Sequence, residues 1–296
     1  MGLRIGIDLG GTNLRVGLVN EKGQILNEQE CPTEPQKGSD CVIQNMIKMI
    51  ESVKGDKSII GVGIGSPGPL NPKTGVIIEP PNLTGWSNVP IVELVSKATG
   101  LSVTLDNDAN AAALAEATIG AGAKHESVFY ITVSTGIGGG LVIGKKVFQG
   151  AQGYAGEIGN MIVNPNGRNH ANLNPGALEA QASGTAISAI GREKLGITGG
   201  AAEVFRLAEE GHTEAKKLID EALQYLAIGI ANLAHSINPE VFILGGGVLK
   251  SEKQVLEPLR EKVKALVYPG LRDSIQILPA GLGTKAGIIG AAFLAG

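Results

Sequence analysis

A short segment near the N-terminus places one carboxylate directly before a glycine pair. Asp8 ends the predicted strand 4–8. The turn after it consists of Gly10, Gly11, Thr12 and Asn13. Because glycine has no Cβ, backbone N–H groups in such a turn can approach phosphate oxygens closely. Asp8 is then placed to hold Mg²⁺ through water. An ordinary glycine hairpin would contain the same residues, so the segment alone leaves both interpretations open.

A second glycine-rich turn is predicted at residues 134–140, between apolar segments 128–133 and 141–143. Its Thr135 and Gly136 could bind phosphates in the same way. The glycines at 138–140 do not match the spacing G-x-G-x-x-G, and a strand is expected after them where a dinucleotide-binding motif needs a helix. This mismatch excludes a nicotinamide oxidoreductase.

Carboxylates and amides gather where the predicted strand 101–105 meets a predicted helix. Asp106, Asn107, Asp108 and Asn110 lie within five residues of each other. A helix N-terminus favours an ionised carboxylate. An ionised aspartate can accept the proton of a hydroxyl that attacks a phosphoryl group. The segment also fits a structural aspartate N-cap, and different residues could fill the two roles.

A third glycine run, Gly245-Gly246-Gly247, follows the predicted strand 241–244. It could pass beneath an adenine or ribose, or it could be a plain turn from strand to helix.

Scattered polar residues suit a sugar, because carboxylates and amides bind vicinal hydroxyls by accepting and donating hydrogen bonds. Candidates are Asn82, Glu157 and Glu179. Any one of them, taken alone, fits a solvated surface side chain equally well.

The elements that position these residues occur twice. Strands at 4–8, 14–19 and 24–30 form a meander, and a similar order of strand and turn restarts at 128, about 125 residues later. The repeat predicts an α/β protein with two similar halves and a ligand cleft between them. The other predicted strands are 59–65, 101–105, 241–244 and 275–278, and the predicted helices are 40–53, 90–99, 108–119, 213–237 and 284–294.

Composition narrows the function classes. The chain has 296 residues, with 44 glycines, 43% hydrophobic and 18% charged residues, which favours about two folded domains. A net charge of −3 without a dense basic run argues against nucleic acid and anionic membranes as partners. No signal peptide or membrane-length apolar run is recognised. Cys31 and Cys41 form no C-x-x-C pair, and a reducing cytoplasm is expected, with a single bridge between the two left open.

Taken in order, these segments resemble the ROK family (repressors, uncharacterised reading frames and sugar kinases) within the actin/hexokinase-like ATPase fold. The resemblance covers nearly the whole chain. It rests on residues 7–12, 65–69, 106–110, 135–140, 156–159, 178–184 and 245–247.

The resemblance implies a role for each matching position. Asp108 corresponds to the catalytic base toward the sugar 6-hydroxyl. Residues implied in sugar contact are Gly65, Pro67, Gly68, Asn82, Asn107, Glu157, Asn160 and Glu179. Gly10–Asn13, Thr135 and Gly136 correspond to phosphate-binding positions, Asp8 lies near Mg²⁺, and Gly245–Gly247 lies near the adenosine. A small domain (1–118, with the helix at 284–296 packing back on it) and a large one (119–283) are expected to close on the substrates.

The chain departs from the family where many members bind zinc. Asn160 replaces a histidine that ligates zinc and touches the sugar, and three cysteines are replaced by His170, Asn172 and Ala177. No thiolate remains and asparagine is not a usual zinc ligand, so no structural zinc is expected.

The leading hypothesis is an ATP-dependent hexose 6-kinase, with glucose first and fructose, mannose or an N-acetylhexosamine as alternatives. A hypothesis of another class is a sugar-responsive regulator or non-catalytic sensor. Against a repressor, the first predicted strand begins at Arg4, which leaves no room for a preceding helix-turn-helix domain. The donor (ATP or polyphosphate) and the preferred hexose stay open, and a homodimer is expected.

Overall fold

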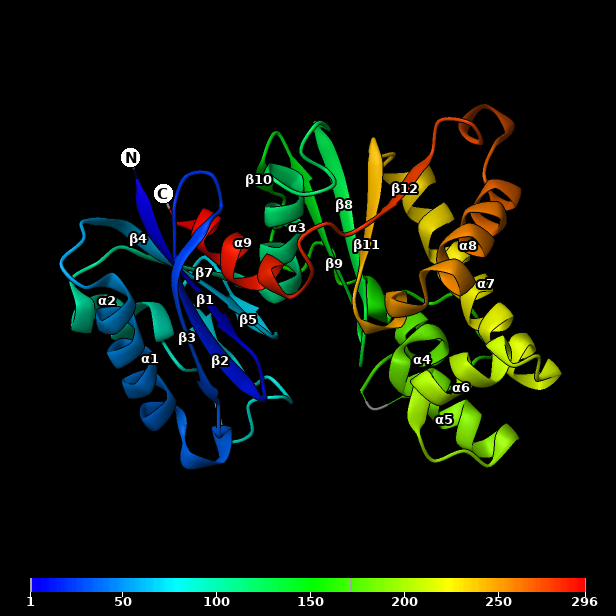
Figure 1. Cartoon of the computed structure of the whole chain (residues 1–296), viewed down its shortest axis with the longest axis horizontal. Coiled ribbons are helices and arrows are strands. Elements are labelled where there is room, and N and C mark those ends of the chain that lie inside the picture. The colour runs from blue at the N-terminus through cyan, green and yellow to red at the C-terminus, as the bar shows by residue number, and fades with distance from the viewer. Residues whose placement is uncertain (1, 171, 296) are drawn as a thin grey trace. The chain divides into compact units, whose positions relative to one another are not determined.

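The computed structural model describes residues 2–170 and 172–295, and it divides into two compact units. Unit 1 comprises Met1–Lys124, Gly140–Ala155 and Gly281–Gly296, and unit 2 comprises His125–Gly139 and Gly156–Ala280. Over the described residues the strands form two five-stranded sheets and one two-stranded sheet (Figure 1).

The first sheet has the strand order β3-β2-β1-β4-β7. The first three strands form an antiparallel meander, and β4 and β7 then continue parallel to β1. Their bounds are Leu3–Leu9 (β1), Asn13–Val19 (β2), Ile25–Pro32 (β3), Ile59–Ser66 (β4) and Val103–Asn107 (β7), with the small pair β5 (Leu70–Asn71) and β6 (Val76–Ile77) beside them in the chain. The expected meander is confirmed.

The second sheet repeats this topology in the order β10-β9-β8-β11-β12. Strands β8, β11 and β12 run parallel, and β10 pairs antiparallel with β9. The bounds are Ser127–Val133 (β8), Ile137–Ile143 (β9), Lys146–Val147 (β10), Val241–Gly245 (β11) and Gln276–Pro279 (β12). Each sheet is therefore a meander followed by two parallel strands, which confirms the predicted duplication of an α/β half.

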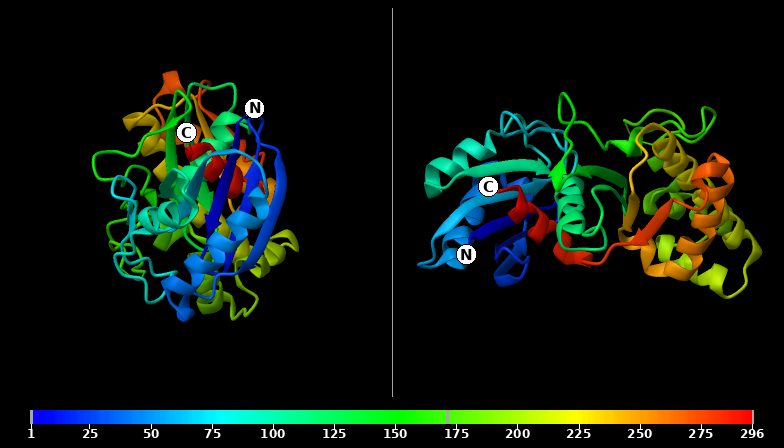
Figure 2. Two further views of the ribbon diagram at one scale, coloured as in Figure 1. Left: turned by 90° about the vertical axis from the view of Figure 1, so that its left-hand side faces the viewer. Right: turned by 90° about the horizontal axis from the view of Figure 1, so that it is seen from above.

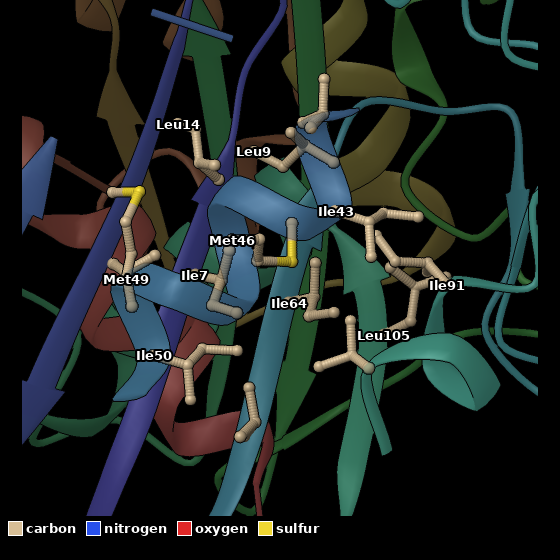
Figure 3. Packing of buried hydrophobic residues seen from close by; sticks show 14 of the residues in the cluster. Ile7, Leu9, Leu14, Ile43, Met46, Met49, Ile50, Ile64, Ile91 and Leu105 are labelled. Carbon is tan, nitrogen blue, oxygen red and sulfur yellow. The ribbon is translucent and has the colours of Figure 1, made fainter. Parts of the chain in front are cut away.

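One face of the first sheet carries bulky apolar side chains, because residues two apart on a strand share a face. Ile7, Leu9 and Ile64 are fully buried there. Helices α1 (Ser39–Lys54) and α2 (Ile91–Thr99) cover this face, and Figure 3 shows α1 placing Met46 and Ile50 against the strands.

The opposite face is built from glycines, so that helix α9 (Ala286–Leu294) can lie almost directly on the strand backbones. A Cβ at Gly63 would lie 2.7 Å from the carbonyl carbon of Ala291, and one at Gly6 would lie 2.8 Å from the nitrogen of Ala292. Helix α3 (Asp108–Thr118) packs beside α9. Arg4 Nε donates to the carbonyl of Ala295, the residue after α9, at 2.7 Å. The marks N and C accordingly lie near each other in both views of Figure 2.

This close approach predicts a strong stability effect at Gly63. Gly63→Ala would force α9 away from the sheet, and overpacking of this kind costs about 1–3 kcal/mol or more. We expect a clearly lower thermal unfolding midpoint than in the wild type. Gly270→Ala is the matched control, because a Cβ at Gly270 meets nothing within 4 Å. A Gly63→Ala protein as stable as the control would contradict the packing described above.

Helices make up most of unit 2 outside its sheet. The predicted helix at 213–237 is present as α7 (Thr213–Ser236), whereas the patterns did not predict the helices around it. These are α4 (Leu178–Ala182), α5 (Gly184–Leu195), α6 (Gly200–Glu209) and α8 (Glu252–Leu266), with short 3-10 turns at Ile158–Asn160, Gly247–Ser251 and Pro269–Leu271; unit 1 adds turns of the same kind at Pro35–Lys37 and Gly283–Lys285. In the described part of the chain, no helix combines the length and apolarity needed to cross a membrane.

The predicted glycine turn at 134–140 is shorter than expected, because β9 already begins at Ile137. Two of its glycines serve packing within the strand. A Cβ at Gly139 would lie 2.9 Å from the Gly156 carbonyl oxygen, and one at Gly140 would lie 2.8 Å from the Ala113 Cβ. Only residues 134–136 remain as the turn.

Candidate functional site

The predicted residues fall into two groups, one in each unit. We call those in unit 1 the N-terminal half-site, which consists of Asp8, Gly10, Gly11, Thr12, Asn13, Gly65, Pro67, Gly68, Asn82, Asn107 and Asp108. We call those in unit 2 the C-terminal half-site, which consists of Thr135, Gly136, Glu157, Asn160, Glu179, Gly245, Gly246 and Gly247.

In the N-terminal half-site, the first glycine turn is fixed by a residue that the sequence did not reveal. The Gly10 N–H donates to the Asn13 carbonyl at 2.9 Å and closes the hairpin. Thr33, which is only 2% exposed, holds the turn from behind. Its Oγ1 donates to the Gly10 carbonyl at 2.6 Å, and its N–H donates to the Thr12 carbonyl at 2.8 Å. The turn is thus held in one conformation without using the N–H groups of Gly11, Thr12 or Asn13 for these contacts.

Asp8 lies at the end of β1, opposite Arg15 on β2 and Gly65 on β4. Its Oδ2 lies 3.6 Å from Arg15 Nη1. Burial raises the pKa of Asp8 from the usual 3.8 to about 6; Arg15 opposes this rise, and the charges of Asp108 and Glu30 add to it. Burial therefore makes negative charge on this carboxyl unfavourable even beside Arg15, and a further cation such as Mg²⁺ would favour the charged form.

Neighbouring residues of the acidic segment at the start of α3 differ in burial and in hydrogen bonding. Asp106 is 1% exposed, and its carboxylate accepts bonds from the Asn107 N–H (2.7 Å), Asn110 Nδ2 (2.8 Å) and Gln149 Nε2 (2.7 Å). Asn107 is the N-cap of α3 and accepts from the Ala109 N–H at 2.8 Å. Asp108 is exposed at the first position of the helix. Asn107 is thus the cap residue of α3, and Asp108 Oδ1 accepts from the same Ala109 N–H at 2.8 Å while its side chain stays exposed.

Two further segments converge on these residues within unit 1. A Cβ at Gly11 would lie 2.6 Å from the carbonyl oxygen of Asn82, so Asn82 adjoins the glycine turn. A Cβ at Gly65 would lie 3.7 Å from the Asp108 Cα, so the loop after β4 adjoins the start of α3. In that loop Pro67 is buried, and the peptide between Gly68 and Pro69 is cis. The structure therefore brings the predicted sugar and phosphate residues of unit 1 together.

In the C-terminal half-site, the second glycine turn is docked against the start of α5. The Ser134 N–H donates to the Gly136 carbonyl at 2.9 Å, and the Gly184 N–H donates to the Ser134 carbonyl at 2.8 Å. The third glycine run lies beside this turn. Gly246 has a φ of 99°, and a Cβ there would lie 2.6 Å from the Val133 carbonyl carbon, so only glycine fits.

A cavity of about 560 Å³ opens between these two glycine segments and helices α5 and α6. Small-molecule sites typically have volumes of roughly 300–1,000 Å³, and this cavity falls in that range. Thr135 and Gly247 line one side, and Ser188, Arg192 and Phe205 line the helical side. The helical residues were missed, because nothing in their local pattern distinguishes a pocket lining from an ordinary helix surface. A cavity of this size, lined by a glycine turn and mixed polar and apolar side chains, can hold a nucleoside.

Of the predicted sugar residues of unit 2, Glu179 lies against the same turn. Glu179 Oε2 accepts from the Ile137 N–H at 2.7 Å, and a Cβ at Gly136 would lie 2.9 Å from the Glu179 Cδ. The Glu157 side chain reaches solvent, yet partial burial and the nearby charge of Glu179 raise its pKa. Asn160 is exposed, and its Oδ1 accepts from the Asn174 N–H at 2.7 Å. That bond leaves the Asn160 Nδ2 as a donor for a ligand.

The absence of zinc stays a prediction with a direct test. Of the positions aligned with zinc ligands, His170 lies in an irregular loop, and its neighbour Ala171 lies outside the described residues. Outside Met1, Ala171 and Gly296, no group of three or more His, Cys, Asp or Glu side chains is arranged to hold a metal. We expect elemental analysis of protein purified without chelators to find no stoichiometric zinc. One zinc per chain would contradict this expectation.

The comparisons with known proteins agree on the family of this chain. The family model described as ROK family matches residues 4–296. A glucokinase from Thermotoga maritima is 37% identical over 97% of this chain and 95% of its own. The structure of a ROK hexokinase from Thermus thermophilus superposes with a TM-score of 0.89 at 35% identity, covering 99% of this chain and 97% of that one. A ROK family glucokinase from Streptomyces griseus, solved with glucose and AMPPNP, gives a TM-score of 0.83 at 33% identity and covers 99% of both chains.

Proposed function

This chain belongs to the ROK family, and from that premise we propose that it is an ATP-dependent hexose kinase that transfers the γ-phosphate to the 6-hydroxyl of glucose. The observation that carries the proposal is the position of Asp108. It lies exposed at the N-terminus of α3, beside the loop of Gly65 and in the same unit as the glycine turn and Asn82. The names of the similar enzymes support glucose as the sugar.

The proposed reaction assigns each half-site its own task. Asp108 accepts the proton of the 6-hydroxyl as that oxygen attacks the γ-phosphorus, and the bond from phosphorus to the leaving ADP oxygen breaks. The N-terminus of α3 places the Asp108 carboxylate where the helix dipole favours negative charge. Asn82 and Asn107 from unit 1, and Glu157, Asn160 and Glu179 from unit 2, bind the other hydroxyls.

The nucleotide is assigned to the glycine segments and to the cavity of unit 2. Backbone N–H groups at Gly11–Asn13 and at Thr135–Gly136 bind phosphate oxygens, and the 560 Å³ cavity beside Gly247 receives the adenosine. Asp8 would hold Mg²⁺ through water, and the ion would neutralise charge on the transferred phosphoryl group. The raised pKa of Asp8 fits this role, because a nearby cation favours the charged carboxylate.

The test is an ADP-release assay with Mg-ATP across glucose, fructose, mannose, N-acetylglucosamine and N-acetylmannosamine, with polyphosphate as an alternative donor. We expect the largest kcat/KM with glucose and ATP. A larger kcat/KM with another hexose would correct the substrate. Sugar binding without turnover on any hexose would overturn the kinase assignment in favour of a sensor.

A further inference from the structure

The two proposed sugar residues Asn160 and Glu179 are the ends of one irregular segment, which we call the 161–177 loop. Its described residues form no helix and only an isolated bridge between Ile162 and Ala177. At the base of the loop, the Leu178 N–H donates to the Met161 carbonyl at 2.7 Å. The path of this loop therefore decides how Asn160 and Glu179 are placed relative to each other.

The loop lies on a polar surface, so hydrophobic packing contributes little to holding it. A cavity of about 220 Å³ separates part of it from helices α5 and α7, and the residues around this cavity are mainly polar. Asn164 Nδ2 donates to the Tyr225 hydroxyl at 2.9 Å. Arg168 forms a two-pronged ion pair with Glu193, but both side chains are exposed. Exposed pairs of this kind stabilise a protein by only about 0–1 kcal/mol.

One buried side chain fixes the middle of the loop. Gln181, on the short helix α4, is 4% exposed. Its Oε1 accepts from the Arg168 N–H at 3.3 Å, and its Nε2 donates to the Arg168 carbonyl at 3.1 Å. A Cβ at the neighbouring Gly167 would lie 2.8 Å from that Oε1, so the loop backbone approaches Gln181 closely. Both ends of the amide are therefore used on a single backbone residue.

The contact continues from Arg168 to the sugar site. The Arg168 carbonyl also accepts from the Gly176 N–H at 3.0 Å, which joins the outgoing and returning arms of the loop. On the returning arm, the Asn174 N–H donates to Asn160 Oδ1 at 2.7 Å. Gln181 thus connects through Arg168 and the returning arm to Asn160, while Glu179 lies two residues before it on the same helix.

We propose that Gln181 is a positioning residue for the sugar site, which holds the 161–177 loop through the backbone of Arg168 and thereby orients Asn160 relative to Glu179. This proposal rests on the proposed kinase function. It assigns to a buried amide the task of ordering the loop, and it predicts an effect confined to sugar binding. The cavity for the nucleoside and Asp108 lie outside the contacts that Gln181 makes.

The test replaces Gln181 by methionine, which has a similar length but neither donor nor acceptor on its end. We expect the KM for glucose to rise roughly 10-fold, because small displacements of positioning groups are costly, while kcat and the KM for ATP stay within about twofold. Hydrogen exchange in residues 161–177 should become faster, and that in α3 should not. A purely structural role would instead lower the folded fraction and leave the KM of the remaining enzyme unchanged.

Two further variants make the result decisive. Arg168→Met removes the exposed ion pair but keeps the backbone contacts, so it should match the wild type in all three constants. Gly167→Ala places a Cβ against the Gln181 amide and should also raise the KM for glucose. If Gln181→Met does not fold, the KM of Gly167→Ala tests the proposal in its place. An unchanged KM for glucose in folded Gln181→Met would overturn the proposal. Failure of the wild type to bind or phosphorylate any hexose would instead sink the proposed function, and hydrogen exchange would still report on the loop.

Discussion

Asp108→Asn is expected to lower kcat for glucose phosphorylation roughly 10²- to 10⁴-fold, the usual loss when a general base is removed. The amide cannot accept the proton of the 6-hydroxyl at the moment of attack. The Asp108 side chain is exposed and Asn107 caps α3, and an asparagine keeps an oxygen that can accept from the Ala109 N–H, so we expect little loss of stability. Steady-state kinetics with Mg-ATP and glucose, together with thermal unfolding, measure both quantities on one sample.

Asp106→Asn is the informative comparison, because it makes the same chemical change two residues away. Asp106 is buried and accepts two hydrogen bonds at Oδ1 and one at Oδ2. An amide in its place has only one oxygen, so at least one buried donor loses its acceptor, at a cost of about 1–3 kcal/mol. We expect it to lower stability more than Asp108→Asn does, and to lower turnover less. Near-normal turnover of the Asp108→Asn protein would remove Asp108 from its assigned role.

The sheets were predictable from the sequence because their strands are short apolar segments separated by turn residues. Ile5, Ile7 and Leu9 alternate with small or polar residues, and the structure buries them on one face of the first sheet. At Val128–Val133 the apolar run is almost continuous, and the order of strand, glycine turn and strand after it repeats that of the first sheet. This repeated order made the duplication predictable. Helix α8 shows the helical pattern instead, since Val255, Leu259 and Val263 are spaced four residues apart. That spacing predicts a helix, although none was predicted there.

Parts of the site could not be predicted, because their partners lie far away in the sequence. Thr33 binds the carbonyl of Gly10, 23 residues before it, and Gln181 binds the backbone of Arg168, 13 residues before it. Neither residue type signals such a contact locally. The glycines at 138–140 were assigned to a turn, but the structure places them in a strand. In a sequence, a glycine needed for close packing cannot be distinguished from one needed for a turn.

Asp8→Asn is expected to make the ligand-free protein more stable while it impairs catalysis. The pKa of Asp8 is raised from 3.8 to about 6 in the folded state. Above both values the folded protein carries an ionised carboxylate that would be better solvated in the unfolded chain, at a cost of about 2–3 kcal/mol. The side chain is 20% exposed, so solvent reduces this figure somewhat. The asparagine is neutral and avoids this cost, although it also loses the attraction of Arg15.

The dependence on pH follows from the sign of the shift. The folded state binds the proton more tightly than the unfolded state does, so through this group the wild-type stability is highest below pH 4 and falls as the pH rises toward 6. The advantage of Asp8→Asn should therefore be full at pH 7.5 and about half as large at pH 5. Thermal unfolding in metal-free buffer at the two pH values measures the difference.

Asp56→Asn is the control, because that aspartate is exposed in the same unit and should show no advantage at either pH. Adding Mg-ATP gives a second comparison of the stability of the two proteins. If Asp8 holds Mg²⁺ through water, the nucleotide complex should stabilise the wild type more than Asp8→Asn, so the order of the two proteins narrows or reverses on adding it. An Asp8→Asn protein that is less stable than the wild type at pH 7.5 without ligand would show that the Arg15 contact outweighs burial. Equal stabilisation of both proteins by Mg-ATP would remove Asp8 from the metal site.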